Sequence, residues 1–329
     1  MPPTVVHPQS TSLNADADPR DGWRSQLSTR LPTTRWRTRF APAPTGYLHL
    51  GHLVNALYVW GLARRFGGDV ILRIEDHDRS RCRAEYETAL LDDLEWLGFA
   101  ADVAPVDSYR AQVRGHAFRQ SDNNHRYQDA LDALDAAGMV YPCECTRRVI
   151  ANQVPHRDGE EPRYPGSCRS RQIEPQSTPA RRVAIPDGEL LFSDLRLGAI
   201  SQNPAHQCGD VLAVDRHGHW TYQFTVTVDD IAHGVDVVIR GEDLLPSTAR
   251  QFCLAELLGR REPPLVLHHP LLVHRNGAKL SKANRDTSLR ARRADGASPQ
   301  LLLGEAAYLA GLTTSPTPMS ATEVGSLFA

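Results

Sequence analysis

The chain has 329 residues, with 37 Lys and Arg residues against 39 Asp and Glu residues and a formal net charge of −2. This near balance excludes a polybasic protein that grips its partner by bulk charge. A hydrophobic fraction of 41% and a charged fraction of 23% exclude disorder of the whole chain and allow one large or two ordinary domains. Only two of the basic residues are lysines, Lys279 and Lys282.

The sequence carries no signal for a membrane or for export. No apolar run approaches the roughly 20 residues that span a bilayer. The beginning of the chain lacks both the basic and the apolar region of a secretory signal. Six cysteines are too few for a disulfide scaffold in a chain of this size. We therefore expect a soluble, cytoplasmic protein.

The first predicted elements form a βαβ unit. Residues 1–35 are rich in Pro, Ser, Thr and Asp without any period, so a flexible N-terminal extension is expected there. Residues 36–100 begin with an extended segment that leads through the Pro-containing run FAPAP into a predicted helix at 52–66. A buried strand is expected at 69–76. This order predicts a parallel sheet and an α/β fold.

The middle of the chain differs from the sections on either side of it. Residues 101–209 contain a predicted helix at 123–137, three cysteines and a section rich in Pro, Arg and Ser. The simplest explanation is an insertion domain between two halves of a Rossmann-like nucleotide-binding core, the second half being 210–290. Residues 291–329 are expected to form a short C-terminal helical segment. The second half has its own set of expected elements at 210–215, 221–230, 236–244 and, as a helix, 247–259.

A turn rich in glycine and histidine, TGYLHLGH, follows the first predicted strand. Glycine lets the backbone approach a ligand closely, and the start of the next helix presents unpaired N–H groups to a phosphate. His49 and His52 can donate further hydrogen bonds to phosphate oxygens. A helix cap or a pair of metal ligands explains these two histidines about equally well.

The two lysines lie in a polar loop, KLSKA, after the apolar stretch 264–273. Ammonium groups on flexible stems can follow a polyphosphate and stabilise the charge that develops on it. Because the chain uses Arg at its other basic positions, Lys279 and Lys282 are expected to supply compact, mobile charges. The alternative is a solvated surface pair.

Together these motifs resemble the two ATP-binding motifs of class I aminoacyl-tRNA synthetases, commonly written HIGH and KMSKS. The runs RFAP, LRIED, VDD and IRGEDL are similar to the glutamyl-tRNA synthetase branch. The resemblance covers about residues 36–290 and implies a Rossmann-like class I catalytic core. It implies catalytic roles for His49, His52, Lys279 and Lys282, and ATP contacts for Gly51, His52 and Lys282.

The resemblance also implies a pocket for glutamate. Arg39 and Arg240 are expected to bind the carboxylates, because a guanidinium group matches a carboxylate with two parallel hydrogen bonds. Glu75 would accept from the α-ammonium group, and Tyr222 would add a hydroxyl and a flat apolar wall. The family's glutamate-binding run corresponds to Arg39, Phe40, Ala41, Pro42 and Ala43, where Ala43 stands in place of the usual serine.

Two features make the chain similar to the glutamyl-queuosine tRNA(Asp) synthetase family. Only residues 284–329 follow the lysine loop, whereas an anticodon-reading domain needs on the order of 100 residues, so no such domain is expected. In the insertion, three thiolates and a phenol suit a structural Zn²⁺, although free thiols explain the cysteines equally well on spacing alone. The resemblance implies that the zinc ligands are Cys143, Cys145, Tyr164 and Cys168.

The resemblance to that family implies a monomeric ligase with one structural Zn²⁺. ATP with Mg²⁺ would convert glutamate to glutamyl-adenylate, and the glutamyl group would pass to queuosine in the anticodon of tRNA(Asp). A truncated glutamyl-tRNA synthetase for tRNA(Glu) and a silent paralogue that binds tRNA or nucleotide are the alternatives. The candidates for a basic surface that meets the tRNA are Arg147, Arg148, Arg163, Arg169 and Arg171. The alternative is that these side chains only form a solvated loop.

Overall fold

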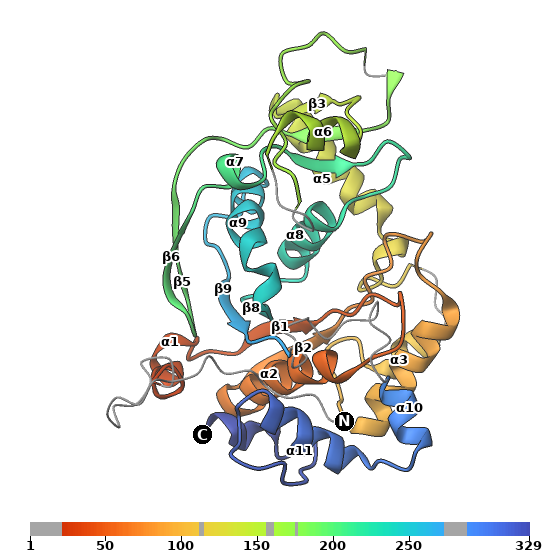
Figure 1. The fold of residues 1–329 in the computed structure, drawn as a ribbon, viewed down its shortest axis with the longest axis vertical. Helices are drawn as coiled ribbons and strands as arrows, with labels where there is room; N and C mark the ends of the chain where they lie inside the picture. The colour runs from red at the N-terminus through yellow and green to blue at the C-terminus, as the bar shows by residue number, and fades with distance from the viewer. Residues whose placement is uncertain (1–21, 112–114, 156–160, 175–176, 273–287) are drawn as a thin grey trace.

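The computed structural model is elongated, and its two ends have different architectures (Figure 1). An α/β core with the C-terminal helices occupies one end, and the cysteine-bearing part of the middle section occupies the other. The structure describes residues 22–111, 115–155, 161–174, 177–272 and 288–329.

A parallel βαβ unit begins the core, as the sequence predicts. It consists of β1 (Trp36–Phe40), α2 (Leu50–Phe66) and β2 (Gly68–Leu72), and the two strands pair in parallel. Helix α2 is almost entirely buried, and it ends at Gly67. The φ of Gly67 is 74°, a left-handed conformation that glycine adopts without strain, so the chain can turn directly into β2.

The second half of the core adds strands to the same layer. Strands β8 (Val237–Gly241) and β9 (Leu265–His269) pair in parallel. The backbone N–H of Asp236, just before β8, donates to the carbonyl of Arg37 in β1 (2.9 Å), so β8 lies beside β1. The parallel strands therefore follow the order β9, β8, β1, β2, which confirms the Rossmann-like α/β class. Between β8 and β9 lie η4 (Glu242–Ser247) and α9 (Thr248–Leu257), the latter within the predicted helix.

The boundary expected at residues 209 and 210 does not separate the two sheets. The hairpin of β5 (Leu190–Asp194) and β6 (Gly198–Gln202) belongs to the expected insertion, yet β5 pairs in parallel with β9 and extends the core sheet. Conversely, β7 (Val211–Val214) joins the sheet of the middle section, where it pairs with β4 (Arg181–Val183), and β4 pairs with β3 (Val140–Pro142). An alternating sequence predicts a strand but does not identify its partner, because strand pairing is non-local.

Residues 222–232 form a helix, α8 (Tyr222–Ala232), although their alternating Thr and Val residues are typical of a strand. Two threonines satisfy their hydroxyls within the helix: Thr225 and Thr227 donate to carbonyls four residues earlier (3.2 and 2.8 Å). Phe224 and Val228 pack into the hydrophobic core of the middle section. Tertiary packing therefore overrides the local preference for a strand.

Part of the expected N-terminal extension is folded. Residues 22–35 contain η1 (Arg24–Gln26) and α1 (Leu27–Arg30), so the expectation of a flexible segment over 1–35 is wrong for this part. Trp23, Leu27 and Leu31 are buried in the main core, with Leu27 fully covered. Their spacing of four residues is the helical signal that identifies this segment. Residues 1–21 lie outside the described residues.

Short helices and loops connect the strands of the middle section. The predicted helix at 123–137 is confirmed as α5, one residue shorter at each end. Helix α6 lies near β3 at the end of the molecule farthest from the C-terminal helices (Figure 1). The remaining elements before β7 are α3 (Ala84–Leu97), α4 (Val106–Arg110), η2 (Gln120–Asp122), α5 (Asn124–Ala136), α6 (Arg147–Gln153) and α7 (Pro204–Gln207).

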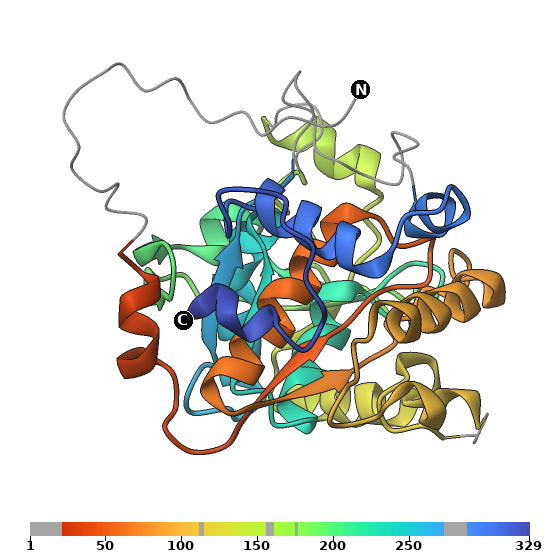
Figure 2. The same ribbon diagram turned by 90° about the horizontal axis from the view of Figure 1, so that it is seen from below.

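The C-terminal segment is helical, as expected, and it covers α2. It contains α10 (Leu289–Ala294), α11 (Pro299–Leu309) and η6 (Val324–Phe328), of which α11 and η6 pack against α2. Figure 2 shows these segments, in blue, lying across α2, in orange. None of the helices in the described part of the chain combines the length and the apolar character of a membrane span.

The contact between α2 and η6 depends on Gly61. A Cβ atom on Gly61 would lie 2.4 Å from Cε2 of Phe328 and 3.0 Å from the carbonyl oxygen of Val324. We predict that Gly61→Ala lowers the free energy of unfolding by about 1–3 kcal/mol through overpacking, although Ala favours a helix interior by about 1 kcal/mol over Gly. Thermal and urea unfolding measure this change.

Gly325→Ala is the matched control in the same interface. A Cβ atom on Gly325 would make only an ordinary contact, 3.5 Å from Cβ of Arg64. This variant should unfold within about 0.5 kcal/mol of the wild type. A Gly61→Ala protein as stable as the wild type would show that the close approach of Phe328 does not constrain the helix.

Candidate functional site

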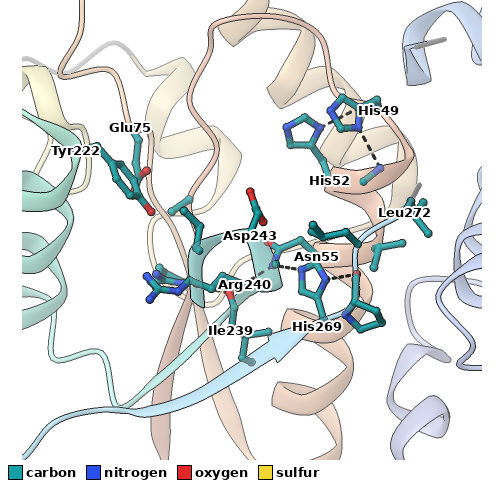
Figure 3. A pocket seen from close by; sticks show the side chains of 18 of the residues that line it. His49, His52, Asn55, Glu75, Tyr222, Ile239, Arg240, Asp243, His269 and Leu272 are labelled. Atoms are coloured by element: carbon teal, nitrogen blue, oxygen red, sulfur yellow. Dashed lines mark hydrogen bonds between the residues drawn. The ribbon is translucent and has the colours of Figure 1, made fainter. Parts of the chain in front are cut away.

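A cavity of about 500 Å³ opens at the carboxyl ends of the parallel strands. In open α/β sheets this edge is the usual place for a ligand. Figure 3 shows Glu75, Tyr222 and Arg240 at one end of the cavity and His49 and His52 at the other. The structure thus brings most of the residues expected for glutamate (Arg39, Ala41, Glu75, Tyr222 and Arg240) and two of those expected for ATP (Gly51 and His52) into one cavity. These residues come from distant parts of the chain.

The two histidines cap helix α2. Nδ1 of His49 accepts from the backbone N–H of Gly51, and Nδ1 of His52 accepts from the backbone N–H of His49 (3.1 Å each). Because Nδ1 accepts in both rings, the ring proton must lie on Nε2. A Cβ atom on Gly51 would lie 2.9 Å from Cε1 of His49, so a glycine is needed here. The helix-cap interpretation is correct, and it leaves each Nε2 as a donor.

A buried ion network fixes Arg39, which also lines the cavity. Nε of Arg39 and Nη1 of Arg73 both donate to Oδ1 of Asp230 (3.1 and 2.7 Å). Nη2 of Arg73 donates to Oε1 of Glu75 (2.9 Å). Burial opposes ionisation of Asp230, but Arg39 and Arg73 outweigh it and lower the pKa of Asp230 to about 2. Nη2 of Arg39 has no hydrogen-bond partner among the described residues, so it is the atom that can bind a ligand.

Arg240, on β8, is buried and hydrogen-bonded on all three nitrogens. Nη1 donates to Oε1 of Gln251 (2.6 Å), Nη2 to Oγ1 of Thr248 (2.8 Å) and Nε to Nε2 of His268 (3.1 Å). Burial lowers the pKa of Arg240, yet a guanidinium group stays charged at neutral pH because its ordinary pKa is so high. The charge is therefore held rigidly at the wall of the cavity, beside Tyr222.

The strand β1 divides the expected glutamate-binding run. Arg39 and Ala41 line the cavity. Phe40 lies between them and points to the other face of the sheet, because side chains alternate along a strand. It is buried in the main core, where its ring packs against Trp60 with the centroids 5.1 Å apart. Phe40 therefore supports the site through packing.

The next two residues of that run contribute through the backbone. The carbonyl of Pro42 accepts from the N–H of Glu75 (3.1 Å), which ties the end of β1 to the residue expected to bind the α-ammonium group. The carbonyl of Ala43 accepts from the N–H of Thr45 (2.8 Å) in the turn before α2. At Tyr222, burial raises the pKa to about 12, so its hydroxyl is neutral at physiological pH.

Several polar residues of the site carry no role in the sequence analysis. Asn55 and His269 line the cavity, and Nδ2 of Asn55 lies 3.1 Å from Nε2 of His269. Burial lowers the pKa of His269 to about 4, so this ring is neutral. Asp230 and His268 lie behind the cavity wall. A charged residue within an apolar run, as in VTVDDIA around Asp230, is the sequence signal for such buried partners.

The expected zinc ligands lie together at the far end of the middle section. The Sγ atoms of Cys143, Cys145 and Cys168 lie within 4.8 Å of one another. Sγ of Cys145 is 3.5 Å from Sγ of Cys168, and Sγ of Cys143 is 3.6 Å from the hydroxyl of Tyr164. Ligands at about 2.3 Å around a tetrahedral Zn²⁺ are about 3.8 Å apart. The three thiols therefore have a spacing that could hold a metal ion, and the Tyr164 hydroxyl lies next to one of them.

Two other groups of expected residues have different outcomes. Lys279 and Lys282 lie outside the described residues. Of the arginines expected to meet tRNA, Arg169 and Arg171 form ion pairs within the middle section, and Arg163 donates to a backbone carbonyl. The other two, at the start of α6, are exposed.

Comparison with known proteins identifies the family. A family model described as "tRNA synthetases class I (E and Q), catalytic domain" matches residues 35–319. A "Glutamyl-Q tRNA(Asp) synthetase" from Symbiobacterium thermophilum is 41% identical over 88% of this chain and 91% of its own length. A "Glutamate--tRNA ligase 2" from Syntrophus aciditrophicus is 38% identical over 87% of this chain and 59% of its own length.

The solved structures agree with this result. The crystal structure of glutamate-tRNA synthetase from Elizabethkingia anophelis matches with a TM-score of 0.71 and 26% identity. The match covers 88% of this chain and 65% of that chain. The resemblance of the ATP-binding motifs to class I synthetases is thus supported by the sequence of most of the chain and by its fold. The chain belongs to the class I tRNA synthetases of the E and Q type.

Proposed function

We propose that the chain activates glutamate with ATP and transfers the glutamyl group to queuosine in the anticodon of tRNA(Asp). The observation that carries this proposal is the charge of the cavity end formed by Arg39, Glu75, Tyr222 and Arg240. The relatives named glutamyl-Q tRNA(Asp) synthetase, about 40% identical over most of the chain, support the choice of acceptor.

The charges at this end of the cavity suit glutamate better than glutamine. Three guanidinium groups and two carboxylates are buried at this end of the site, which leaves one positive charge in excess among the buried groups: Arg39, Arg73 and Arg240 against Glu75 and Asp230. The carboxylate of Asp243, which also lines the cavity, is exposed and lies on the side of the histidines. Glutamate has two carboxylates and one ammonium group, so its net charge of −1 cancels this excess. Glutamine is neutral and would leave a buried charge uncompensated, which is costly.

The first step needs no protein nucleophile. The α-carboxylate of glutamate attacks the α-phosphorus of ATP, a P–O bond to pyrophosphate breaks, and glutamyl-adenylate forms. Mg²⁺ with ATP supplies charge neutralisation on the phosphates when it is bound. His49 and His52 present Nε2 donors at the start of α2, where the helix dipole also favours phosphate. Lys279 and Lys282 are proposed to stabilise the departing pyrophosphate.

The second step is transfer to an alcohol. A hydroxyl of the queuosine ring attacks the carbonyl of the mixed anhydride, an ester forms and AMP leaves. Arg39, Glu75 and Arg240 hold the amino acid in place during both steps, and this orientation accounts for much of the rate enhancement. Transfer to tRNA(Glu) is the second candidate, because a glutamate–tRNA ligase is among the relatives.

We propose further that Zn²⁺ is bound by Cys143, Cys145, Tyr164 and Cys168. The support is the closeness of the three thiols, which lie within 4.8 Å of one another, and the contact of the Tyr164 hydroxyl with Sγ of Cys143. Nε of Arg182 donates to Sγ of Cys143 (3.3 Å), and such a cation stabilises a bound thiolate. Since none of the four ligands lines the cavity, the metal organises the middle section and takes no part in bond making.

ATP–pyrophosphate exchange without tRNA tests the activation step. We predict exchange that depends on glutamate and not on glutamine, because only glutamate neutralises the site. Arg240→Gln should raise the KM for glutamate roughly 100-fold, as expected for the loss of a buried charged hydrogen bond to the ligand. The matched control is Arg261→Gln on the surface, which should keep the wild-type KM. A wild-type protein without glutamate-dependent exchange would refute the proposed function.

Metal analysis tests the zinc proposal. The purified protein should contain about one equivalent of zinc, and Cys145→Ser should lose it, because a closed structural site needs all four ligands. It should also lower the melting temperature, since metal binding contributes to folding. Cys253→Ser is the matched control, a buried cysteine outside the cluster, and it should keep the metal. Equal zinc content in the two variants would contradict this assignment.

A further inference from the structure

Arg240 is held by a neutral cradle, which we define as the side chains of Thr248, Gln251 and His268. Each member accepts one hydrogen bond from one nitrogen of the guanidinium group, over 2.8, 2.6 and 3.1 Å. Thr248 and His268 are fully buried, and Gln251 is only 8% exposed. Oγ1 of Thr248 also lies 3.1 Å from Nε2 of His268, and Nε2 of Gln251 donates to Oε1 of Gln223 (2.8 Å). Because the three partners are buried and themselves held by hydrogen bonds, the cradle fixes the position of Arg240.

The cradle positions Arg240 without neutralising it. Among the described residues, no ion pair or hydrogen bond joins Arg240 to a carboxylate. The charged groups that face it are Arg39 with its partner Asp230 and, on the side of the histidines, Asp243 (Figure 3). Arg39 and Arg73 differ in this respect, since both are paired directly with Asp230. Arg240 is thus the cation of the site whose charge is left for the ligand.

The β5–β6 hairpin sets the tautomer of His268. Nδ1 of His268 lies 2.7 Å from Oδ2 of the fully buried Asp194, so Nδ1 carries the proton and donates to it. Nε2 of His268 must then be the acceptor that Arg240 needs. The other oxygen of Asp194 accepts from the backbone N–H groups of Arg196 and Leu197 (2.8 Å each). Both oxygens of the Asp194 carboxylate therefore accept hydrogen bonds, and His268 lies between this carboxylate and Arg240.

Helix α1 holds the β5–β6 hairpin in the position that places Asp194 against His268. Nη1 of Arg30 in α1 donates to the carbonyl of Leu195, and Nη2 donates to the carbonyl of Asp194 (2.9 Å each). Figure 1 shows α1 next to the end of the hairpin. The chain of contacts thus runs from Arg30 through Asp194 and His268 to Arg240.

We propose that Thr248, Gln251 and His268, with Asp194 behind His268, are positioning residues that determine specificity for an acidic amino acid. They hold Arg240 in place with neutral acceptors only, so that its charge is satisfied by the side-chain or α-carboxylate of the substrate. This inference rests on the proposed activation of glutamate. It predicts that a counter-charge in the cradle weakens glutamate binding even when the geometry is preserved.

Gln251→Glu tests the charge. The replacement has nearly the same shape but gives Arg240 a carboxylate partner. We expect the KM for glutamate in ATP–pyrophosphate exchange to rise roughly 10- to 100-fold, while the KM for ATP stays within about twofold. Gln202→Glu is the matched control, since Gln202 is also buried and donates to the carbonyl of Leu245. It should lower the melting temperature but keep the KM for glutamate.

His268→Leu and His268→Gln test the position. Leucine removes the acceptor for Nε of Arg240, whereas glutamine offers a carbonyl near the place of Nε2 and an amide group for Asp194. We expect His268→Leu to raise the KM for glutamate about tenfold or more and His268→Gln to restore most of it. His233→Leu is the control for removing a buried histidine elsewhere, and it should leave this KM unchanged.

The outcomes separate this inference from the proposed function. A wild-type protein without glutamate-dependent exchange refutes the function itself. Normal exchange in the wild type combined with an unchanged KM for glutamate in folded Gln251→Glu overturns the neutral cradle. Equal losses for ATP and glutamate, or a His268→Gln protein as impaired as His268→Leu, also overturn it. If Gln251→Glu does not fold, the His268 pair decides alone.

Discussion

The carboxylate of Asp230, shared by Arg39 and Arg73, is the interaction on which the site depends. It joins helix α8 to strand β1 and to the residue that follows β2, so three segments distant in the sequence meet at one buried anion. Removing one partner from such a buried group typically costs about 3–5 kcal/mol, because the remaining charges lose their compensation. Asp230 fixes Arg39 at the cavity, and Arg73 in turn orients Glu75.

Arg240 is held by uncharged side chains, whereas Arg39 and Arg73 are held by a carboxylate. Asp230 and Glu75 compensate the charges of Arg39 and Arg73, whereas the acceptors around Arg240 are neutral. The site therefore combines a fully paired scaffold with one cation whose counter-charge must come from the ligand. The β5–β6 hairpin, within the expected insertion, and a helix near the N-terminus support this cation through Asp194. Elements that look peripheral in the sequence thus help to hold Arg240, which we propose binds the amino acid.

Local patterns predict the parts of the fold that depend on local physics. Hydrophobic periodicity and turn residues predict the βαβ unit, α5 and the C-terminal helices. The resemblance of the motifs predicts that Arg39, Glu75, Tyr222 and Arg240 share one pocket, and all four line the cavity. The pairing of β5 with β9 and the helical state of residues 222–232 depend on tertiary contacts that no local pattern contains. The same holds for the partners of Arg240, since Gln251 and Thr248 become neighbours of β8 only when α9 packs against the sheet.

We propose that this catalytic core passes glutamate to a modified anticodon base. The most direct measurement is the transfer of radiolabelled glutamate to three purified substrates, tRNA(Asp) with queuosine, tRNA(Asp) without queuosine and tRNA(Glu), under the same conditions. We expect label on tRNA(Asp) with queuosine alone, in a linkage as labile to mild base as an ester. Label on tRNA(Glu), or equal label on both forms of tRNA(Asp), would contradict it.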